Sequence, residues 1–399
     1  MRLSSEEQAM LDGKDGPAVQ KAMRILVALG TIYQAENLIP VTSVQISGVS
    51  YDNLGEAGLA FLAEMADGGG RARVLTTLNP AGMDLENWPA LGISPAFAAQ
   101  QTRVIEAFTR MGVNTTCTCT PYLAGNTPGL GDTIAWAESS AVAYANSILG
   151  ARSNREGGPS ALAASLTGLT PAYGLHLSVN RQPGLTFTLE SPLAGTHAYG
   201  ALGKVIGQAL EALNQKPVPY IQGITNPTIE ELKSFCASLA TYGGVALFHI
   251  PGVTPEPAAL PPPGETIPIT PSQIEQAMAS LSNATAEEVD FYSLGCPHLT
   301  IQEIARVAQL LENKHVKHEF WITTSRPVRQ MAEALGYVRI IEASGAKFAT
   351  DTCCVVAPIQ GRFHALATDS AKACYYAYAK NKEKTRLLPF DQVVLEALQ

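Results

Sequence analysis

Three of the seven cysteines in this 399-residue sequence stand where predicted strands end. Cys119 follows a strand expected over residues 113–118, Cys296 follows one over 289–294, and Cys353 comes shortly after one over 347–350. Thiolates at the carboxyl ends of three strands could converge on one metal centre. Soft sulfur ligands are what an iron–sulfur cluster needs, and three of them would leave one iron of a four-iron cluster open as a Lewis acid.

The alternative is that all seven cysteines are ordinary buried thiols, because a free cysteine packs as a small apolar residue. The sequence contains no Cys-x-x-Cys pair, and the long separations between the three cysteines match no local zinc or ferredoxin pattern. Spacing alone therefore favours this second interpretation.

Several polar residues have the chemistry to act beside such a centre. Glu138 and Ser139 enter an otherwise apolar helix, where they would either cap the helix or contact a substrate. Lys372 lies at a predicted helix start and would either bind an anionic group or remain a surface lysine. His298, two residues after Cys296, would help to hold substrate, tune the centre, or serve as a structural histidine.

Two arginines lie in the Gly- and Asn-rich segment 150–160. Arg152 and Arg155 would clamp a substrate carboxylate or a partner chain, unless the segment is simply a solvated loop. His249 ends another predicted strand, over residues 245–250, and we favour a structural role for it.

The elements that must position these residues alternate as strand, loop and helix, which predicts an α/β fold with mainly parallel strands. In such sheets ligands bind beyond the carboxyl ends of the strands. The length exceeds that of one typical core, so we expect several α/β subdomains, divided into an N-terminal region over 1–215 and a C-terminal region over 216–399. A further strand is predicted over 338–342.

The composition excludes several classes of protein. The net charge is −8 and no basic run stands out, which argues against a nucleic-acid binder. No apolar stretch approaches the roughly 20 residues needed to span a bilayer. No signal peptide is recognisable, so we expect a cytoplasmic protein with reduced thiols. The glycine patterns of the P-loop, the dinucleotide fold and the α/β-hydrolases are not present.

Several segments of the chain have distinctive motifs. They are Gly48-Val49-Ser50-Tyr51, Thr76-Thr77-Leu78-Asn79-Pro80-Ala81-Gly82, Thr118-Cys119-Thr120-Pro121-Tyr122, Ala135-Trp136-Ala137-Glu138-Ser139-Ser140, the 150–160 loop, Gly295-Cys296-Pro297-His298 and Asp351-Thr352-Cys353. In these motifs and in their order, the sequence resembles the aconitase X family from Leu3 to beyond Lys372. The resemblance implies an aconitase-like fold around a central iron–sulfur site, either 4Fe–4S or 2Fe–2S.

The resemblance also implies roles for individual residues. The cluster ligands would be Cys119, Cys296 and Cys353, while Cys117, Cys236, Cys354 and Cys374 would be bystanders. The implied substrate contacts are Gly48, Val49, Ser50, Asn79, Pro80, Glu138, Ser139 and Lys372, of which Ser50, Glu138, Ser139 and Lys372 would be catalytic. One residue departs from the pattern: Asp369 stands where the family usually has Asn.

The implied activity is that of a hydro-lyase that dehydrates a small hydroxy acid. In this family a small swivelling domain carries a catalytic Ser, which would remove the proton next to the carboxylate. The chain leaves no room for that domain, so we expect a separate small subunit as partner.

Of the family's two substrate classes, cis-3-hydroxy-L-proline, giving Δ1-pyrroline-2-carboxylate, is favoured over 5-phosphomevalonate. The reasons are an Ala- and Gly-rich composition and the absence of an added basic cluster for a phosphate. A non-catalytic iron-sensing, RNA-binding protein and a zinc-bound structural subunit are the alternatives of other classes.

Overall fold

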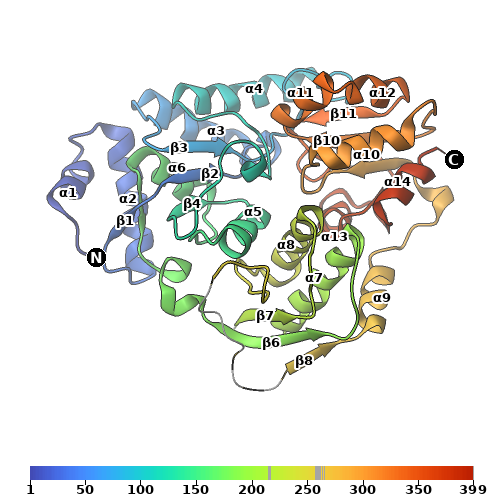
Figure 1. Cartoon of the computed structure of the whole chain (residues 1–399). Coiled ribbons are helices and arrows are strands. Elements are labelled where there is room, and N and C mark those ends of the chain that lie inside the picture. The colour runs from blue at the N-terminus through green and yellow to red at the C-terminus, as the bar shows by residue number, and fades with distance from the viewer. Residues whose placement is uncertain (214–216, 257–261, 263, 265, 399) are drawn as a thin grey trace.

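Parallel sheets make up most of the strand structure of this chain. The computed structural model describes residues 1–213, 217–256, 262, 264 and 266–398. In this part of the chain, parallel sheets have the orders β3-β2-β4, β7-β6-β8 and β11-β10-β9-β12-β13, and β1 and β5 form an antiparallel pair. Figure 1 shows the first and last of these sheets on opposite sides of the molecule, with α5, α8 and α13 between them. The predicted α/β class with mainly parallel strands is confirmed.

The N-terminal sheet lies under helices whose apolar faces follow the sequence pattern. Its elements are α1 (Ser5–Leu11), α2 (Pro17–Ile32), β1 (Leu38–Pro40), β2 (Ser43–Ile46), α3 (Tyr51–Asp67), β3 (Leu75–Leu78), α4 (Pro95–Arg110), β4 (Ile134–Trp136), α5 (Ser139–Tyr144), α6 (Gly158–Thr167) and β5 (Leu169–Pro171). Val19, Met23 and Leu26 of α2 are buried at helical spacing in one core with β2 and α6.

The middle sheet is covered by two helices that pack unusually closely. The elements here are β6 (Pro183–Leu189), α7 (Thr196–Glu211), β7 (Val218–Gln222), α8 (Ile229–Gly243), β8 (Thr266–Ile269) and α9 (Pro271–Ser280). A Cβ atom added to Gly203 would lie 2.8 Å from the Leu239 amide nitrogen, and one added to Gly207 would lie 2.8 Å from that of Gly243. Glycines on this face of α7 therefore let the two helix backbones approach each other.

The C-terminal sheet has five parallel strands. The elements are β9 (Phe291–Leu294), α10 (Ile301–Leu311), β10 (Glu319–Thr324), α11 (Arg326–Ala334), α12 (Tyr337–Ala343), β11 (Lys347–Thr350), β12 (Ala365–Thr368), α13 (Ala371–Tyr376), β13 (Lys384–Leu387) and α14 (Phe390–Glu396). Helix α10 begins with a capping box between Thr300 and Glu303, as its sequence indicates.

Three segments that were predicted to be strands are not strands in the structure. Residues 338–342 lie in α12, where Val338 and Ile341 are buried one helical turn apart, since a short apolar run fits a buried helix as well as a strand. Residues 113–118 and 245–250 make only isolated bridges, Thr77 with Asn114 and Tyr220 with His249. Both segments run as loops beside a sheet instead of joining it as full strands.

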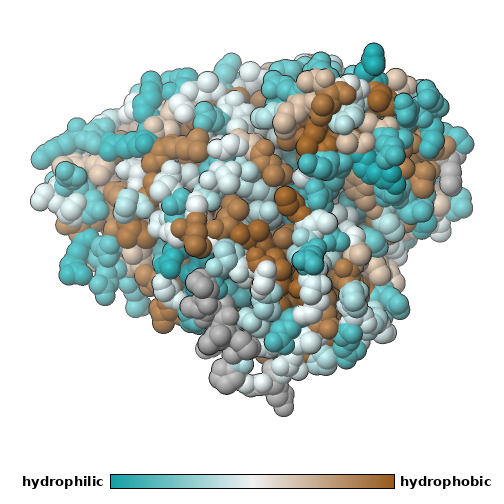
Figure 2. Space-filling view, viewed as in Figure 1, coloured by the Kyte–Doolittle hydropathy of each residue, from teal (hydrophilic) through white to brown (hydrophobic). Residues whose placement is uncertain are grey.

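The predicted division of the chain at residues 215 and 216 falls outside the described residues, and it stays a prediction. Strands β6 and β7 lie on either side of it and pair with each other. On the face shown in Figure 2, hydrophobic residues gather near the centre, over the region of α5 and α8. No helix that the structure describes combines the length and the apolar character needed to cross a bilayer.

Candidate functional site

The carboxyl ends of the N-terminal and C-terminal sheets lead to one cavity of about 220 Å³. Strands β2, β3 and β4 lead to Gly48, Asn79 and Glu138, and β9 and β12 lead to Cys296 and Lys372. A backbone hydrogen bond of 2.8 Å from Ala81 to Asp351 joins loops of the two sheets. The cavity is therefore placed where ligands bind in parallel sheets, but it is shared between two of them.

Most of the residues implied by the resemblance line this cavity. The described residues along its wall are Ser47, Gly48, Asn53, Asn79, Pro80, Cys119, Ala137, Glu138, Ser139, Arg155, Cys296, Cys353, Val355, Val356, Lys372, Tyr376 and Lys380. Of the site residues implied by the resemblance, Val49 and Ser50 alone are missing from this described wall. Segments far apart in the sequence are thus brought together at one place.

An ion pair between Glu138 and Lys372 crosses the cavity from one sheet to the other. Lys372 Nζ lies 2.5 Å from Glu138 Oε1, and both residues are 8% exposed. Asn79 donates to Glu138 Oε2 at 2.8 Å, and the Ser140 hydroxyl donates to Oε1 at 3.0 Å. Glu138 is also the N-cap of α5. The carboxylate is therefore engaged by one ammonium group, one side-chain amide and one hydroxyl.

These contacts decide the charge of both groups. Burial by itself would raise the pKa of Glu138, but the Lys372 charge and the hydrogen bonds from Lys372, Ser140 and Asn79 hold that pKa below its ordinary value. Burial works against the charged form of Lys372 too, yet Glu138 and the nearby thiols raise the lysine pKa. Both side chains are therefore charged near neutral pH.

Asn79 keeps one acceptor free. Its amide nitrogen is used by Glu138, while its buried Oδ1 has no hydrogen-bond partner among the described residues. A buried acceptor without a partner is costly, so a donor that enters the cavity, such as a substrate hydroxyl, would relieve that cost.

Val49 and Ser50 lie behind the wall of the cavity. Val49 is 1% exposed in the N-terminal core, and the hydroxyl of the fully buried Ser50 donates to the Val356 carbonyl at 3.1 Å. Gln101 of α4 holds this loop by donating to the Val49 carbonyl at 3.0 Å and accepting from the Gly82 amide at 3.0 Å. These contacts give the two residues a role in shaping the loop, and a direct role for Ser50 in catalysis stays a prediction.

The three predicted cysteine ligands line the same cavity, and His298 joins the loops that carry them. Its ring lies 3.0 Å from the Thr118 hydroxyl and 3.0 Å from the Thr352 carbonyl, beside Cys119 and Cys353. Its backbone amide donates to Cys119 Sγ at 3.2 Å. Because the Thr352 carbonyl accepts, Nε2 carries the proton and Nδ1 accepts from Thr118. Burial lowers the pKa of His298 to about 4, so the ring is neutral.

A second buried ion pair holds the backbone of this histidine. Lys233 of α8, which is 2% exposed, donates to the His298 carbonyl at 2.8 Å and lies 2.7 Å from Glu303. The capping residue Glu303 therefore also holds the Lys233 ammonium next to the turn that carries Cys296 and His298. Lys233 carries no local signal in the sequence, because nothing near it in the chain marks it as buried.

The residues at the cavity fit an iron–sulfur cluster by their chemistry. Cys119, Cys296 and Cys353 are free and face one cavity. Burial is the largest cause of the raised pKa of each thiol, and Cys353 lies close enough to raise the pKa of Cys119 and Cys296 further. No group of three His, Cys, Asp or Glu in the described part of the chain is spaced to hold a single metal ion. A cluster binds its cysteines through different iron atoms, so it requires thiols that share a cavity rather than one point.

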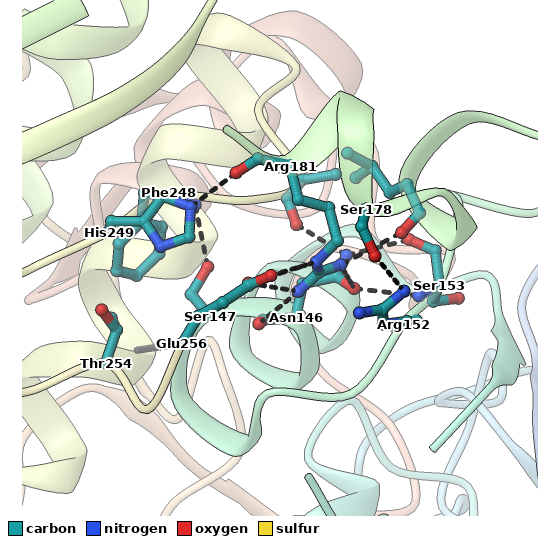
Figure 3. A network of polar contacts seen from close by, with 12 residues as sticks. Asn146, Ser147, Arg152, Ser153, Ser178, Arg181, Phe248, His249, Thr254 and Glu256 are labelled. Atoms are coloured by element: carbon teal, nitrogen blue, oxygen red, sulfur yellow. Dashed lines mark hydrogen bonds and ion pairs between the residues drawn. The ribbon is translucent and has the colours of Figure 1, made fainter. Parts of the chain in front are cut away.

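The two arginines of the 150–160 loop have different surroundings. Arg152 is not among the described residues of the cavity wall, and it donates to the His176 carbonyl at 3.2 Å and to Ser178 at 2.9 Å (Figure 3). Arg155 is exposed and lines the cavity. His249 is 1% exposed and its ring meets the Arg181 carbonyl at 2.8 Å, which agrees with the structural role favoured for it.

Asp369 and the four remaining cysteines lie outside the cavity wall. Asp369 accepts from Thr196 at 2.6 Å, and its burial raises its pKa to about 6. All four of the cysteines predicted to be bystanders, Cys117, Cys236, Cys354 and Cys374, are buried.

Asn53, Tyr376 and Lys380 are cavity residues that sequence reasoning missed. A signal for two of them existed. Lys372, Tyr376 and Lys380 follow one another at spacings of four, which places them on one helical face. Helix α13 continues as the π-helical turn Ala377–Asn381, and turns of this kind are frequent at functional sites.

Three comparisons with known proteins agree with one another. Models of the aconitase X first, second and third domains match residues 1–179, 183–279 and 289–399. The chain is 45% identical over 377 residues to the phosphomevalonate dehydratase large subunit of Methanothermobacter thermautotrophicus, covering 94% of this chain and 93% of that protein. It is 34% identical to the cis-3-hydroxy-L-proline dehydratase of Pseudomonas aeruginosa, covering 94% and 66%.

The fold has a counterpart among solved structures. The crystal structure of Thermococcus kodakaraensis aconitase X in its holo-form superposes with a TM-score of 0.92 at 41% identity, and the match covers 100% of both chains.

Proposed function

Because this chain belongs to the aconitase X family, we propose that it is the large subunit of a phosphomevalonate dehydratase. The chain is the large subunit of an aconitase X hydro-lyase, and the choice of substrate is the proposed step. The relatives support phosphomevalonate better than the hydroxyproline substrate favoured from the sequence. Identity to the phosphomevalonate enzyme is 45%, against 34% to the hydroxyproline enzyme.

The partner in this proposal is a separate small subunit. Relatives that bear the name large subunit are covered over 92% to 96% of their length, whereas the hydroxyproline dehydratases are covered over only 65% to 66%. The name itself supports a small subunit that completes the site. We place the complex in the cytoplasm as part of the same proposal, because the seven cysteines are free thiols, as in reducing compartments.

The residues of the cavity would bind and orient the hydroxy-acid end of the substrate. The free acceptor of Asn79 would take a hydrogen bond from a substrate hydroxyl, which fixes its orientation. The ammonium of Lys372 uses one contact for Glu138 and keeps further donors for a substrate carboxylate. Because Glu138 is held as a carboxylate, it orients Lys372 instead of donating a proton, and the partner's catalytic Ser removes the substrate proton.

Cys119, Cys296 and Cys353 would hold the iron–sulfur cluster, which would supply a Lewis acid for the departing hydroxyl. Visible absorption of anaerobically purified protein tests this assignment. We expect Cys119→Ala, Cys296→Ala and Cys353→Ala each to lose the cluster absorption. Cys236→Ala, in the core of the middle sheet, should keep it. Equal absorption in all four variants would contradict the assignment.

The substrate is tested with the purified two-subunit complex. We expect dehydration of 5-phosphomevalonate and little or none of cis-3-hydroxy-L-proline. Turnover of hydroxyproline alone would overturn the proposal and restore the interpretation favoured from the sequence.

A further inference from the structure

The cations along the cavity wall differ in how they are neutralised. Buried Lys372 is paired with Glu138 at 2.5 Å. Lys380 is paired with Asp52 at 3.0 Å and also donates to the carbonyl of Val355 at 3.3 Å. No hydrogen bond or ion pair joins Arg155 to any residue that the structure describes. The uncompensated positive charge of the cavity therefore lies on Arg155.

The position of Arg155 in the cavity is at its solvent end. Arg155 and Asn53 are exposed, whereas Glu138, Lys372 and the cysteine ligands Cys119 and Cys353 are buried. A ligand that reaches from the buried end to the exposed end would present its second end to Arg155.

The backbone around Arg155 is held on both sides. The Asn154 side chain donates to the Tyr173 carbonyl at 3.0 Å and accepts from the Leu175 amide at 2.8 Å. The Glu156 amide donates to the Trp136 carbonyl at 2.9 Å. The loop thus fixes the arginine's Cα and leaves only its side chain to be ordered, which reduces the entropy lost when an anion binds.

We propose that Arg155 binds the phosphate of the substrate, while Asn79 and Lys372 contact the end that loses water. The inference rests on the proposed function and names the residue that sets its substrate class. The planar guanidinium offers paired donors that match phosphate oxygens, and a phosphate carries more charge than a carboxylate. cis-3-Hydroxy-L-proline has no second anionic end, so Arg155 would add nothing to its binding.

The test compares Arg155→Gln and Arg155→Lys with Arg152→Gln in the two-subunit complex. Arg152 is the matched control, because it lies in the same loop with its guanidinium on His176 and Ser178. We expect Arg155→Gln to raise KM for 5-phosphomevalonate by about 10- to 100-fold, the range of a lost charge-assisted hydrogen bond. Arg155→Lys should recover part of this loss. Inhibition by inorganic phosphate should weaken in parallel.

Each outcome decides between the two proposals. If the wild-type complex does not turn over 5-phosphomevalonate, the proposed function fails. If it does, and Arg155→Gln keeps the wild-type KM and phosphate inhibition, the role of Arg155 is refuted. Loss of the small subunit from Arg155→Gln in gel filtration would refute it as well, because Arg155 would then be an interface residue. Unchanged cluster absorption would establish that the variant is folded.

Discussion

The ion pair between Glu138 and Lys372 allows a quantitative test of the site. We compare three variants with the wild-type chain: Glu138→Gln, Lys372→Met and the double variant. Gln keeps the acceptor for Ser140, and Met keeps most of the lysine's volume. The pair links α5 of the N-terminal part to α13 of the C-terminal part, so it contributes to stability and to the cavity at once.

The expected magnitude follows from the distance and the burial. At 2.5 Å the Coulomb attraction is about 7 kcal/mol for an effective dielectric constant near 20. Removing two buried charges from water costs several kcal/mol per ion, so the net contribution of the intact pair is small. Removing one partner leaves the other charge buried and unpaired. We therefore expect each single variant to lose about 3–5 kcal/mol of unfolding free energy.

The double variant should lose far less than the two single variants together, because it leaves no unpaired charge. Urea unfolding at pH 7, followed by tryptophan fluorescence and circular dichroism, gives the four free energies. All three variants should also lose turnover, since both residues line the cavity. Additive losses, with no coupling between the two sites, would refute the ion pair as the structure places it.

The remaining predictions concern the support of the site and the packing of the fold. His298→Ala leaves the Thr352 carbonyl and the Thr118 hydroxyl without their partner, so the cysteine loops should loosen and cluster absorption should fall, while exposed His315→Ala keeps it. Asp369→Asn should stabilise the chain by up to about 3 kcal/mol at pH 7. The pKa of Asp369 in the folded chain, about 6, lies above its ordinary value of 3.8, so the unfolding free energy of the wild-type chain should fall as pH rises from 3.8 to 6. The same dependence of unfolding free energy on pH in Asp369→Asn would contradict this. Gly207→Ala should lower the unfolding free energy by about 1–3 kcal/mol, because the added methyl group would push α7 away from α8. Urea unfolding measures this loss, with the exposed Gln208→Ala as control, and equal unfolding free energies in the two variants would show that the helices tolerate a methyl group there.

Local chemistry determined much of the secondary structure in advance. The capping boxes at Thr228 and Thr300 mark the starts of α8 and α10, because their bonds join residues only three positions apart. Strand β11 also lies at the residues predicted for it, 347–350. The same reasoning failed for 338–342, since an apolar run of that length carries no period that separates a helix from a strand.

The identity of the candidate site residues was also within reach of the sequence. Motifs such as Gly295-Cys296-Pro297-His298 carry enough specificity to indicate the family, and the family model of the third domain agrees. The relatives support phosphomevalonate better than the hydroxyproline substrate favoured from the sequence, in which no basic cluster for a phosphate stands out. A lone arginine in a loop gives no such signal until its neighbours in space are known.

Only the tertiary structure decided which of these residues meet. It placed Arg155 on the cavity wall and Arg152 against Ser178, although the two lie three positions apart in one loop. It buried Ser50 against the Val356 carbonyl and placed the Lys233 ammonium on the His298 carbonyl. These arrangements depend on contacts between residues distant in the chain, and their energies come from burial and from pairing across sheets. A local pattern records the propensity of a segment, but the partner it will find is set by the packing of the whole chain.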